Sequence, residues 1–303
     1  MVTAWEGTQL TGAAPLMRRR GALSSLTNWH SPGYGFLGRD ELTNRGLAAE
    51  IFSSMGPRHV TLAFIDREDS TWRPSLEAAD AQGRLLHIRT VQRSPSLRVS
   101  GNWEDFERDR LSRNRRQNFR RARRKLEGQG ELSYQVQDGS ADLDRGLADG
   151  FEVEAAGWKG ARGSAIRSNQ RTQRFYTDVA RWAADQGLLR LSFLRLDRRV
   201  VAFDYGLEHD GVYYLLKTGF DPRYSDFSPG NLLRYESVRQ SFRDGLRRYE
   251  FLGGPEPYKL IWTDELREMG RIQAFSGSPI GRLEHLAWRR IPPIVRRARA
   301  VRG

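Results

Sequence analysis

Three apolar stretches that follow one another with short breaks decide the fold of this chain. They read Leu188-Leu-Arg-Leu-Ser-Phe-Leu-Arg-Leu196, Val200-Val-Ala-Phe-Asp-Tyr-Gly-Leu-Glu-His209 and Val212-Tyr-Tyr-Leu-Leu-Lys-Thr-Gly-Phe220. The breaks contain Asp197-Arg198 and Asp210-Gly211, residue pairs that favour tight turns between strands. The sequence therefore predicts three antiparallel strands joined as a meander.

The segments on either side of the meander complete an α+β pattern. A strand is predicted at 132–137, followed by helices at 141–156 and 172–186 with a glycine-rich loop between them. After the meander come a predicted helix at 231–242 and a strand at 248–252. Helices and strands in this order predict an α+β fold around a mixed sheet.

The first hundred residues are more loosely organised. They contain one helix-like stretch at 42–55 and two strand-like runs at 59–65 and 84–91, separated by Gly and Pro. We therefore expect three parts. These are an incomplete N-terminal lobe at 1–104, a basic linking helix at 105–130, and a C-terminal lobe at 131–303.

The linking helix is densely basic. Ten Arg or Lys residues lie between Arg108 and Lys125, and Phe119, Ala122 and Leu126 form a narrow apolar stripe. One interpretation is a solvated helix whose arginine stems pack on the protein. The other is a surface that holds phosphates. The net charge of +13 makes a polyanionic partner worth considering.

Composition excludes several kinds of site. The chain has no cysteine, so disulfides, thiolate metal sites and a cysteine nucleophile are excluded. The five histidines are scattered without the close pairs of helical metal sites, and no metal is expected. They are His30, His59, His87, His209 and His285. Because no stretch is apolar enough to span a membrane and no secretion signal follows Met1, we expect a cytoplasmic protein.

The loop after the meander has the features of an anion site. It reads Tyr224-Ser-Asp-Phe-Ser-Pro-Gly-Asn-Leu-Leu233. Ser228 is placed to cap the helix, Pro229 fits its first turn, and Gly230 lets an anion approach the backbone amides of Asn231 and Leu232. The same Ser-Pro-Gly is also an ordinary helix start.

Three blocks, in the same order along the chain, resemble a known family. They are Glu154-Ala-Ala-Gly-Trp-Lys-Gly160 with Gly163-Ser-Ala-Ile166, the stretch from Lys217 through Ser228-Pro-Gly230, and Pro257-Tyr-Lys-Leu-Ile-Trp262. Together they resemble the CelD-like and FemAB-like branch of the GNAT acyltransferases over roughly residues 105–262. The resemblance implies a GNAT-like fold with a complete C-terminal lobe and an abbreviated N-terminal lobe.

The resemblance also implies a donor and its site. The donor would be acetyl-CoA, another acyl-CoA or an acyl carrier thioester. Its pyrophosphate would lie on the amides at the start of the helix near Asn231. We accordingly expect Ser228, Gly230, Asn231 and Leu232 to bind the donor.

Acyl transfer to an amine requires a base, so carboxylates near the glycine-rich loop are candidates. Glu154, at the end of a helix, is the first candidate, with an ordinary surface glutamate as the alternative. Lys217 lies in an apolar strand and needs a partner, for which Asp204 on the neighbouring strand is plausible. That pair could bind substrate or be purely structural. Asp221 is a weaker candidate of the same kind.

The resembling blocks suggest acceptor contacts as well. We expect Trp158, Lys159, Tyr258 and Lys259 to line the substrate site, although Trp158, Tyr258 and Trp262 fit a packed core equally naturally.

Three functions remain open from the sequence. The first is an N-acyltransferase that uses acyl-CoA or an acyl carrier protein and a small-molecule or peptide amine. The second is a FemAB-like aminoacyl transferase, with tRNA held by the basic segment 108–125. The third is a non-catalytic basic module, which leaves the resembling blocks unexplained.

Overall fold

A computed structural model describes residues 1–290 except 20, 32, 54–55, 158–162 and 164. The chain divides into two compact units. The first contains residues 1–93 and 267–303, and the second contains residues 94–266. Within the described parts, none of the helices has both the length and the apolarity needed to cross a membrane.

The first unit contains two sheets. β1 (Val2–Glu6), β2 (Gln9–Ala14) and β5 (Leu37–Gly38) form a small antiparallel sheet. The larger sheet is mixed. Its strands lie in the order β3 (Leu16–Arg19), β4 (Ala22–Ser25), β6 (His59–Asp66), β13 (Leu266–Phe275) and β7 (Leu85–Arg98).

Helices cover this larger sheet. α1 (Glu41–Phe52) begins at Asp40, whose side chain accepts the Thr43 N–H, and α2 (Trp72–Ala81) lies beside it. Leu47 of α1 packs in one core with Val60 and Ile272 of the sheet. α9 (Pro279–Arg290) instead contacts Phe275 of β13. Phe275 is three residues after Ile272 on this strand, so the two side chains point to opposite faces of the sheet.

The second unit is built on the predicted meander. β9 (Leu189–Leu196), β10 (Arg199–His209) and β11 (Val212–Phe220) pair antiparallel, and β8 (Leu132–Gln137) extends the sheet beside β9. On the other side, β12 (Arg248–Glu250) runs parallel to β11 and antiparallel to the end of β7. The predictions of a mixed α/β sheet and of an antiparallel meander are confirmed.

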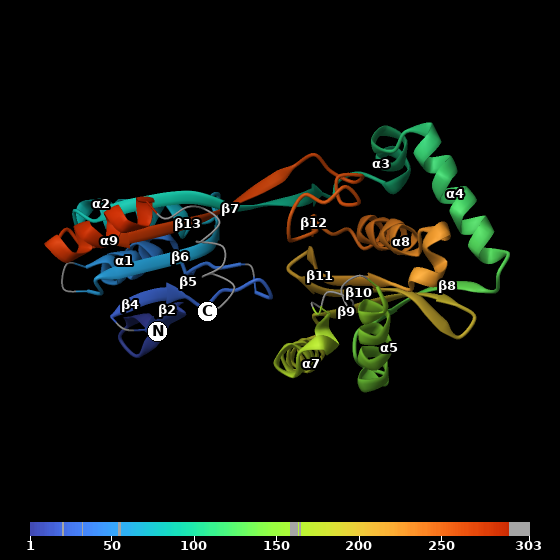
Figure 1. Cartoon of the computed structure of the whole chain (residues 1–303), viewed down its shortest axis with the longest axis horizontal. Coiled ribbons are helices and arrows are strands. Elements are labelled where there is room, and N and C mark those ends of the chain that lie inside the picture. Colours follow the sequence, from blue (N-terminus) through green and yellow to red (C-terminus); the bar gives the residue numbers. More distant parts are fainter. Residues whose placement is uncertain (20, 32, 54–55, 158–162, 164, 291–303) are drawn as a thin grey trace. The chain divides into compact units, whose positions relative to one another are not determined.

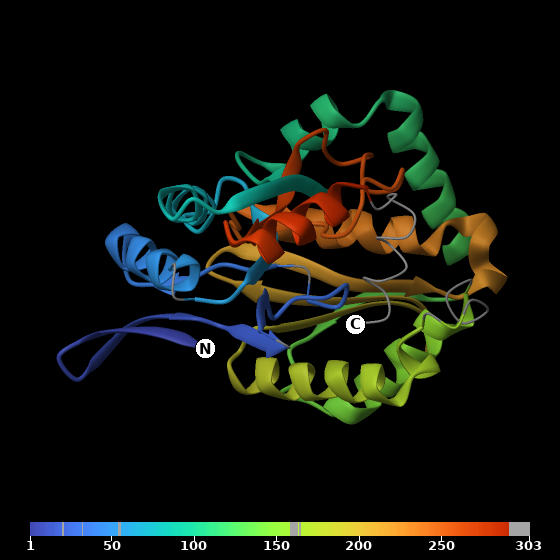
Figure 2. The ribbon, with the colours of Figure 1, turned by 60° about the vertical axis from the view of Figure 1, so that its left-hand side comes forward.

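Helices cover both faces of the second unit's sheet. α8 (Pro229–Arg243) lies on one face, and α5 (Leu143–Ala156) and α7 (Gln170–Asp185) lie on the other (Figure 1). Figure 2 shows the same layers from another direction. Because both faces are covered, β10 is buried without interruption from Val200 to Gly206. Two short 3₁₀ helices, Ile166–Ser168 and Pro222–Phe227, complete the unit.

The predicted basic helix is two helices. α3 (Trp103–Arg110) and α4 (Arg113–Glu127) are separated because Leu111 is extended and Ser112 caps α4 by accepting the Arg115 N–H. Both helices lie on the α8 side of the sheet. Trp103 of α3 and Phe119 of α4 contact the ring of Tyr235 on α8, with centroids 5.0 and 5.1 Å away.

The boundaries of the units differ from those expected at residues 104 and 131. The reason is a long-range pairing: β13 returns to the first unit and pairs antiparallel with β6, from Phe275 opposite His59 to Met269 opposite Asp66. Residues 267–290 therefore lie with the N-terminal part of the chain. α3 and α4 belong to the second unit.

β11 changes its pairing along its length. β12 pairs with it from Val212 to Tyr214, while β11 itself runs on to Phe220. On its other edge, Leu216 is an extra residue between the pairs Gly206–Leu215 and Tyr205–Lys217. This bulge shifts the register by one residue.

A buried ion pair holds α8 against the sheet. Asp204 of β10 and Arg234 of α8 are both fully buried, and the two guanidinium nitrogens donate to the two carboxylate oxygens at 2.5 and 2.7 Å. Arg234 also donates to the Tyr249 hydroxyl at 2.7 Å. Burial alone would lower the pKa of Arg234, but the Asp204 charge holds this pKa well above its usual value. Arg234 therefore keeps its positive charge in the interior.

Replacing Asp204 should destabilise the protein. Asp204→Asn leaves the Arg234 charge buried without its counterion, which costs about 3–5 kcal/mol of unfolding free energy. Urea unfolding measures this loss. The double variant Asp204→Leu/Arg234→Met removes both charges and should recover part of it. A variant Asp204→Asn that unfolds at the wild-type urea concentration would contradict the account.

Candidate active site

The end of β11 brings together the end of α5 and the start of α8. A Cβ atom at Gly219 would lie 2.4 Å from Glu154 Cα, so α5 packs directly on the strand and only glycine fits there. The next residue, Phe220, lies close to two other glycines. A Cβ atom built on Gly157 would lie 3.8 Å from the Phe220 carbonyl oxygen, and one built on Gly230 would lie 3.4 Å from the Phe220 ring. The end of α5, which carries Glu154, and the start of α8 therefore both lie against the last two residues of β11.

Glu154 is buried rather than a surface residue. It occupies the last turn of α5, and Oε2 accepts the Ile166 N–H at 2.9 Å. Its charge reaches Tyr176 of α7: burial raises the pKa of this phenol, and the Glu154 carboxylate raises it further. A buried carboxylate beside a helix end has the chemistry of a proton acceptor.

The expected pair of Lys217 with Asp204 is corrected by the structure. Without the bulge at Leu216, the hairpin that starts with His209 opposite Val212 would place Lys217 opposite Asp204. The bulge instead pairs Lys217 with Tyr205 and Asp204 with Thr218. Successive side chains point to opposite faces, so Asp204 faces Arg234 and Lys217 faces α7. There the Lys217 ammonium lies 5.2 Å from the centre of the Tyr176 ring.

Asp221 has a structural contact. Its carboxylate accepts the Arg223 N–H at 3.0 Å and the Arg223 guanidinium at distances from 2.5 to 3.1 Å. The hydrogen bond from the Arg223 side chain lowers the pKa of Asp221. A carboxylate with a lowered pKa is a weaker base, so Asp221 is a poor second candidate for this role.

The start of α8 differs from the expected cap. Ser228 is the N-cap residue before Pro229, but its backbone is left-handed at φ 50° and its side chain makes no capping hydrogen bond. The N–H groups of Asn231 and Leu232 both donate to the Ser228 carbonyl, at 3.0 and 3.1 Å. Pro229 has no N–H. Fewer amides therefore point outward here than the sequence suggested.

The block from Pro257 to Trp262 lies partly in the core and partly beside a loop that Lys259 holds by hydrogen bonds. Lys259 is buried, and its ammonium donates to the carbonyls of Leu252 and Gly254 at 2.5 and 3.2 Å and pairs with Glu256 at 2.7 Å. Tyr258 is half-buried beside it, with its ring 5.6 Å from the ammonium. Trp262 is fully buried among aromatic rings. Trp158 and Lys159 lie outside the described residues.

Sequence reasoning missed two residues at the centre of this arrangement. Arg234 directly follows two leucines in α8. An arginine in such an apolar context indicates a buried charge that needs a carboxylate partner, which could have pointed to Asp204. Tyr176, next to Lys217 and Glu154, gives no signal in the sequence because an aromatic residue on an amphipathic helix usually faces the core.

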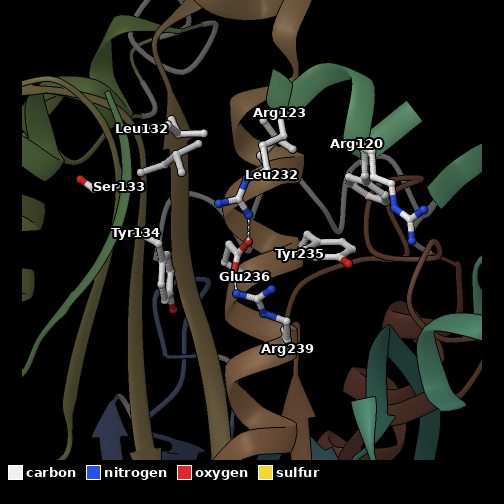
Figure 3. A pocket seen from close by; sticks show the side chains of 11 residues that line it. Arg120, Arg123, Leu132, Ser133, Tyr134, Leu232, Tyr235, Glu236 and Arg239 are labelled. Carbon is white, nitrogen blue, oxygen red and sulfur yellow. Dashed lines mark hydrogen bonds and ion pairs between the residues drawn. The ribbon is translucent and has the colours of Figure 1, made fainter. Parts of the chain in front are cut away.

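A pocket of about 120 Å³ lies between α4, α8 and the edge of the sheet. Figure 3 shows Glu236 of α8 bonded to Arg123 on one side and Arg239 on the other, with Tyr134 and Tyr235 as aromatic walls. Arg120 of α4 also lines it. The pocket is thus aromatic with a positive rim.

The described residues contain no group of three or more His, Asp or Glu side chains arranged to hold a metal ion.

A protein-family model matches most of the second unit. Residues 113–260 match the family model described as acetyltransferase (GNAT) domain. This range includes α4, the whole meander, α8 and β12. A comparison with curated protein sequences gives no significant match.

Solved structures share the fold at low sequence identity. FemX superposes with a TM-score of 0.60 at 12% identity, covering 93% of this chain and 89% of that one. L-PGS from Bacillus licheniformis superposes with a TM-score of 0.58 at 10% identity, covering 91% of this chain and 84% of that one. A third structure is designated the C-terminal domain of a putative lysylphosphatidylglycerol synthetase from Agrobacterium fabrum. It superposes with a TM-score of 0.57 at 13% identity, covering 90% of this chain and 83% of that one.

The site at the end of β11 and the family match lead to the same conclusion. Residues 113–260 match the acetyltransferase (GNAT) domain, the chain has a GNAT-like fold, and the protein is an acyltransferase.

Proposed function

We propose that this protein is an N-acyltransferase that moves an acyl group from a thioester donor to the amine of an acceptor. The donor is acetyl-CoA, another acyl-CoA or an acyl carrier thioester. The observation that carries the proposal is that the end of α5, which carries Glu154, and the start of α8, which carries Gly230, both pack on the last two residues of β11. The blocks quoted from the sequence support assignment to the CelD-like branch.

The donor fits the edge of β11 and the first turn of α8. Beyond Tyr214 this edge is no longer paired with β12, so its backbone groups can bond an extended amide-containing chain. Gly230 lets the donor's phosphates approach the positive end of the α8 dipole. We propose that Ser228, Asn231 and Leu232 contribute backbone contacts there. The commitment of the Asn231 and Leu232 amides to Ser228 limits how many hydrogen bonds this turn supplies.

Glu154 is the proposed base. An acceptor amine is mostly protonated at neutral pH, and its proton must leave before or during attack. Glu154 would accept that proton as the new C–N bond forms and the thioester C–S bond breaks, and the departing thiol would take up a proton in turn. The Lys217 ammonium lies over the Tyr176 ring on the same face of the sheet.

The acceptor contacts remain a proposal. Tyr258 is the half-exposed member of its block, and Lys259 holds the adjacent loop in place through the Leu252 and Gly254 carbonyls. We propose that Tyr258 contacts the acceptor and that Lys259 positions this loop. Trp158 and Lys159 are proposed contacts from the sequence alone.

Glu154→Gln should lower turnover with little effect on donor binding. The amide keeps the size of the side chain and removes its basicity, so kcat should fall by roughly 10² to 10⁴. Part of this activity should return at higher pH, where more of the amine is free. Steady-state kinetics with acetyl-CoA measures both effects. Glu152→Gln, an exposed change on the same helix, is the matched control. Near wild-type turnover of Glu154→Gln at every pH would place the base elsewhere.

Gly230→Val should weaken donor binding. A Cβ at this position already touches the Phe220 ring at 3.4 Å, and the branched side chain fills the approach to the backbone. Losing one or two hydrogen bonds to the donor raises its dissociation constant roughly tenfold. Calorimetric titration with CoA measures the change. In Gly46→Val of α1, where a Cβ meets nothing within 4 Å, binding should stay unchanged. Equal affinities for both variants would disprove the donor placement.

A FemAB-like aminoacyl transferase is the second candidate, favoured by the surface of α4. Six of its cations are exposed and pair with no carboxylate among the residues that the structure describes. They are Arg113, Arg115, Arg120, Arg121, Arg124 and Lys125. Beside them lies the aromatic pocket of Tyr134 and Tyr235, where an unstacked base could lie. Two structures with the same fold carry the name FemX or lysylphosphatidylglycerol synthetase. An acidic acyl carrier protein would suit the same cations.

Binding of tRNA tests this second candidate. If α4 holds RNA, the variant Arg120→Gln/Arg121→Gln/Arg124→Gln should reduce affinity, and wild-type affinity should fall steeply as salt rises. Filter binding with charged and uncharged tRNA measures both. Arg174→Gln on α7, another exposed arginine, is the control and should bind like the wild type. No binding of tRNA even at low salt would eliminate the aminoacyl transferase.

A further inference from the structure

The C-terminal helix α9 presents an apolar stripe to solvent. Ile280, Leu283 and Leu286 are 56, 67 and 50% exposed. They recur every three residues, so they lie on neighbouring turns of one helix surface. Single exposed apolar residues are ordinary, but three large ones on adjacent turns form a patch that usually marks a contact surface.

The other surface of α9 already packs against its own unit. The His285 ring lies 5.4 Å from that of Phe275, and the Trp288 ring lies 6.5 Å from that of His59. Glu284 pairs with Arg58 at 3.4 Å. The side that docks on the sheet is therefore distinct from the side that carries Leu283 and Leu286, and α9 is apolar on two sides.

The charges around the exposed stripe are positive. Arg282 and Arg289 are exposed on α9, whereas the acidic Glu284 is engaged with Arg58. The sequence from Pro279 to Gly303 contains seven arginines and one glutamate, a formal charge of +6. Four of these arginines lie in 291–303, outside the described residues. Leucines flanked by arginines suit a partner that has an apolar interior beneath an anionic surface.

We propose that α9 docks this protein onto an anionic phospholipid bilayer. The leucines would enter the boundary between headgroups and acyl chains, and the arginines would lie among the phosphates, as in interfacial amphipathic helices. An anionic bilayer suits the stripe better than a second copy of this chain, because two copies would bring their arginines together. This docking is independent of the proposed acyl transfer.

Vesicle flotation with the full chain tests the docking. The protein should float with phosphatidylcholine vesicles that contain phosphatidylglycerol or phosphatidylserine, to similar extents, and not with phosphatidylcholine alone. Binding should weaken at high salt because the attraction is screened. Leu283→Glu and Leu286→Glu should each lower the partition coefficient by roughly tenfold or more, since each removes a buried leucine. Arg282→Gln should lower it by less.

Control measurements separate membrane docking from misfolding and from self-association. Leu42→Glu changes a leucine that is 79% exposed in the first turn of α1, and it should float like the wild type. Circular dichroism and light scattering check folding and oligomeric state. Absence of flotation with anionic vesicles, or unchanged flotation of both α9 variants, would overturn the proposal. So would a wild-type dimer that Leu283→Glu converts to a monomer, because the stripe would then join two copies. Flotation with only one of the anionic lipids would indicate headgroup recognition and would also overturn it.

Discussion

The buried pair of Asp204 and Arg234 is the interaction on which the site depends. Taking two charges out of water is costly unless they find partners. Here both carboxylate oxygens of Asp204 accept hydrogen bonds from Arg234, which also donates to the Tyr249 hydroxyl, while the buried Arg234 Nε has no hydrogen-bond partner among the described residues. The geometry therefore has little freedom. The pair fixes the first half of α8 over β10 and so sets where Gly230 meets Phe220.

The bulge at Leu216 in β11 places the structural ion pair and the Lys217 side chain on opposite faces of the sheet. The bulge at Leu216 turns Lys217 away from Asp204 and toward Tyr176. The α8 face of the sheet thus holds the ion pair, while the α5 and α7 face holds Glu154 and Lys217. β11 connects the two faces, and its end carries the proposed reaction. Beyond Tyr214, β11 no longer pairs with β12.

The sequence predicted what depends on local pattern. The strands at 132–137 and 212–220 have the predicted bounds, because alternation and turn residues are local signals. β13 and α9 were not predicted, since β13 is defined by pairing with β6 about two hundred residues earlier. The partner of Asp204 was predicted wrongly because the bulge that selects Arg234 over Lys217 has no residue signature. Glu154 was found only as one carboxylate of several, and its burial depends on α5 packing against Gly219.

The central claim is that a thioester donor lies between the end of β11 and the start of α8. Hydrogen exchange of the backbone amides with and without acetyl-CoA tests it directly. Exchange should be slower in the presence of acetyl-CoA for Leu215–Phe220 and for the first turn of α8, and unchanged for α4. Protection confined to α4, or no protection at the end of β11, would contradict it.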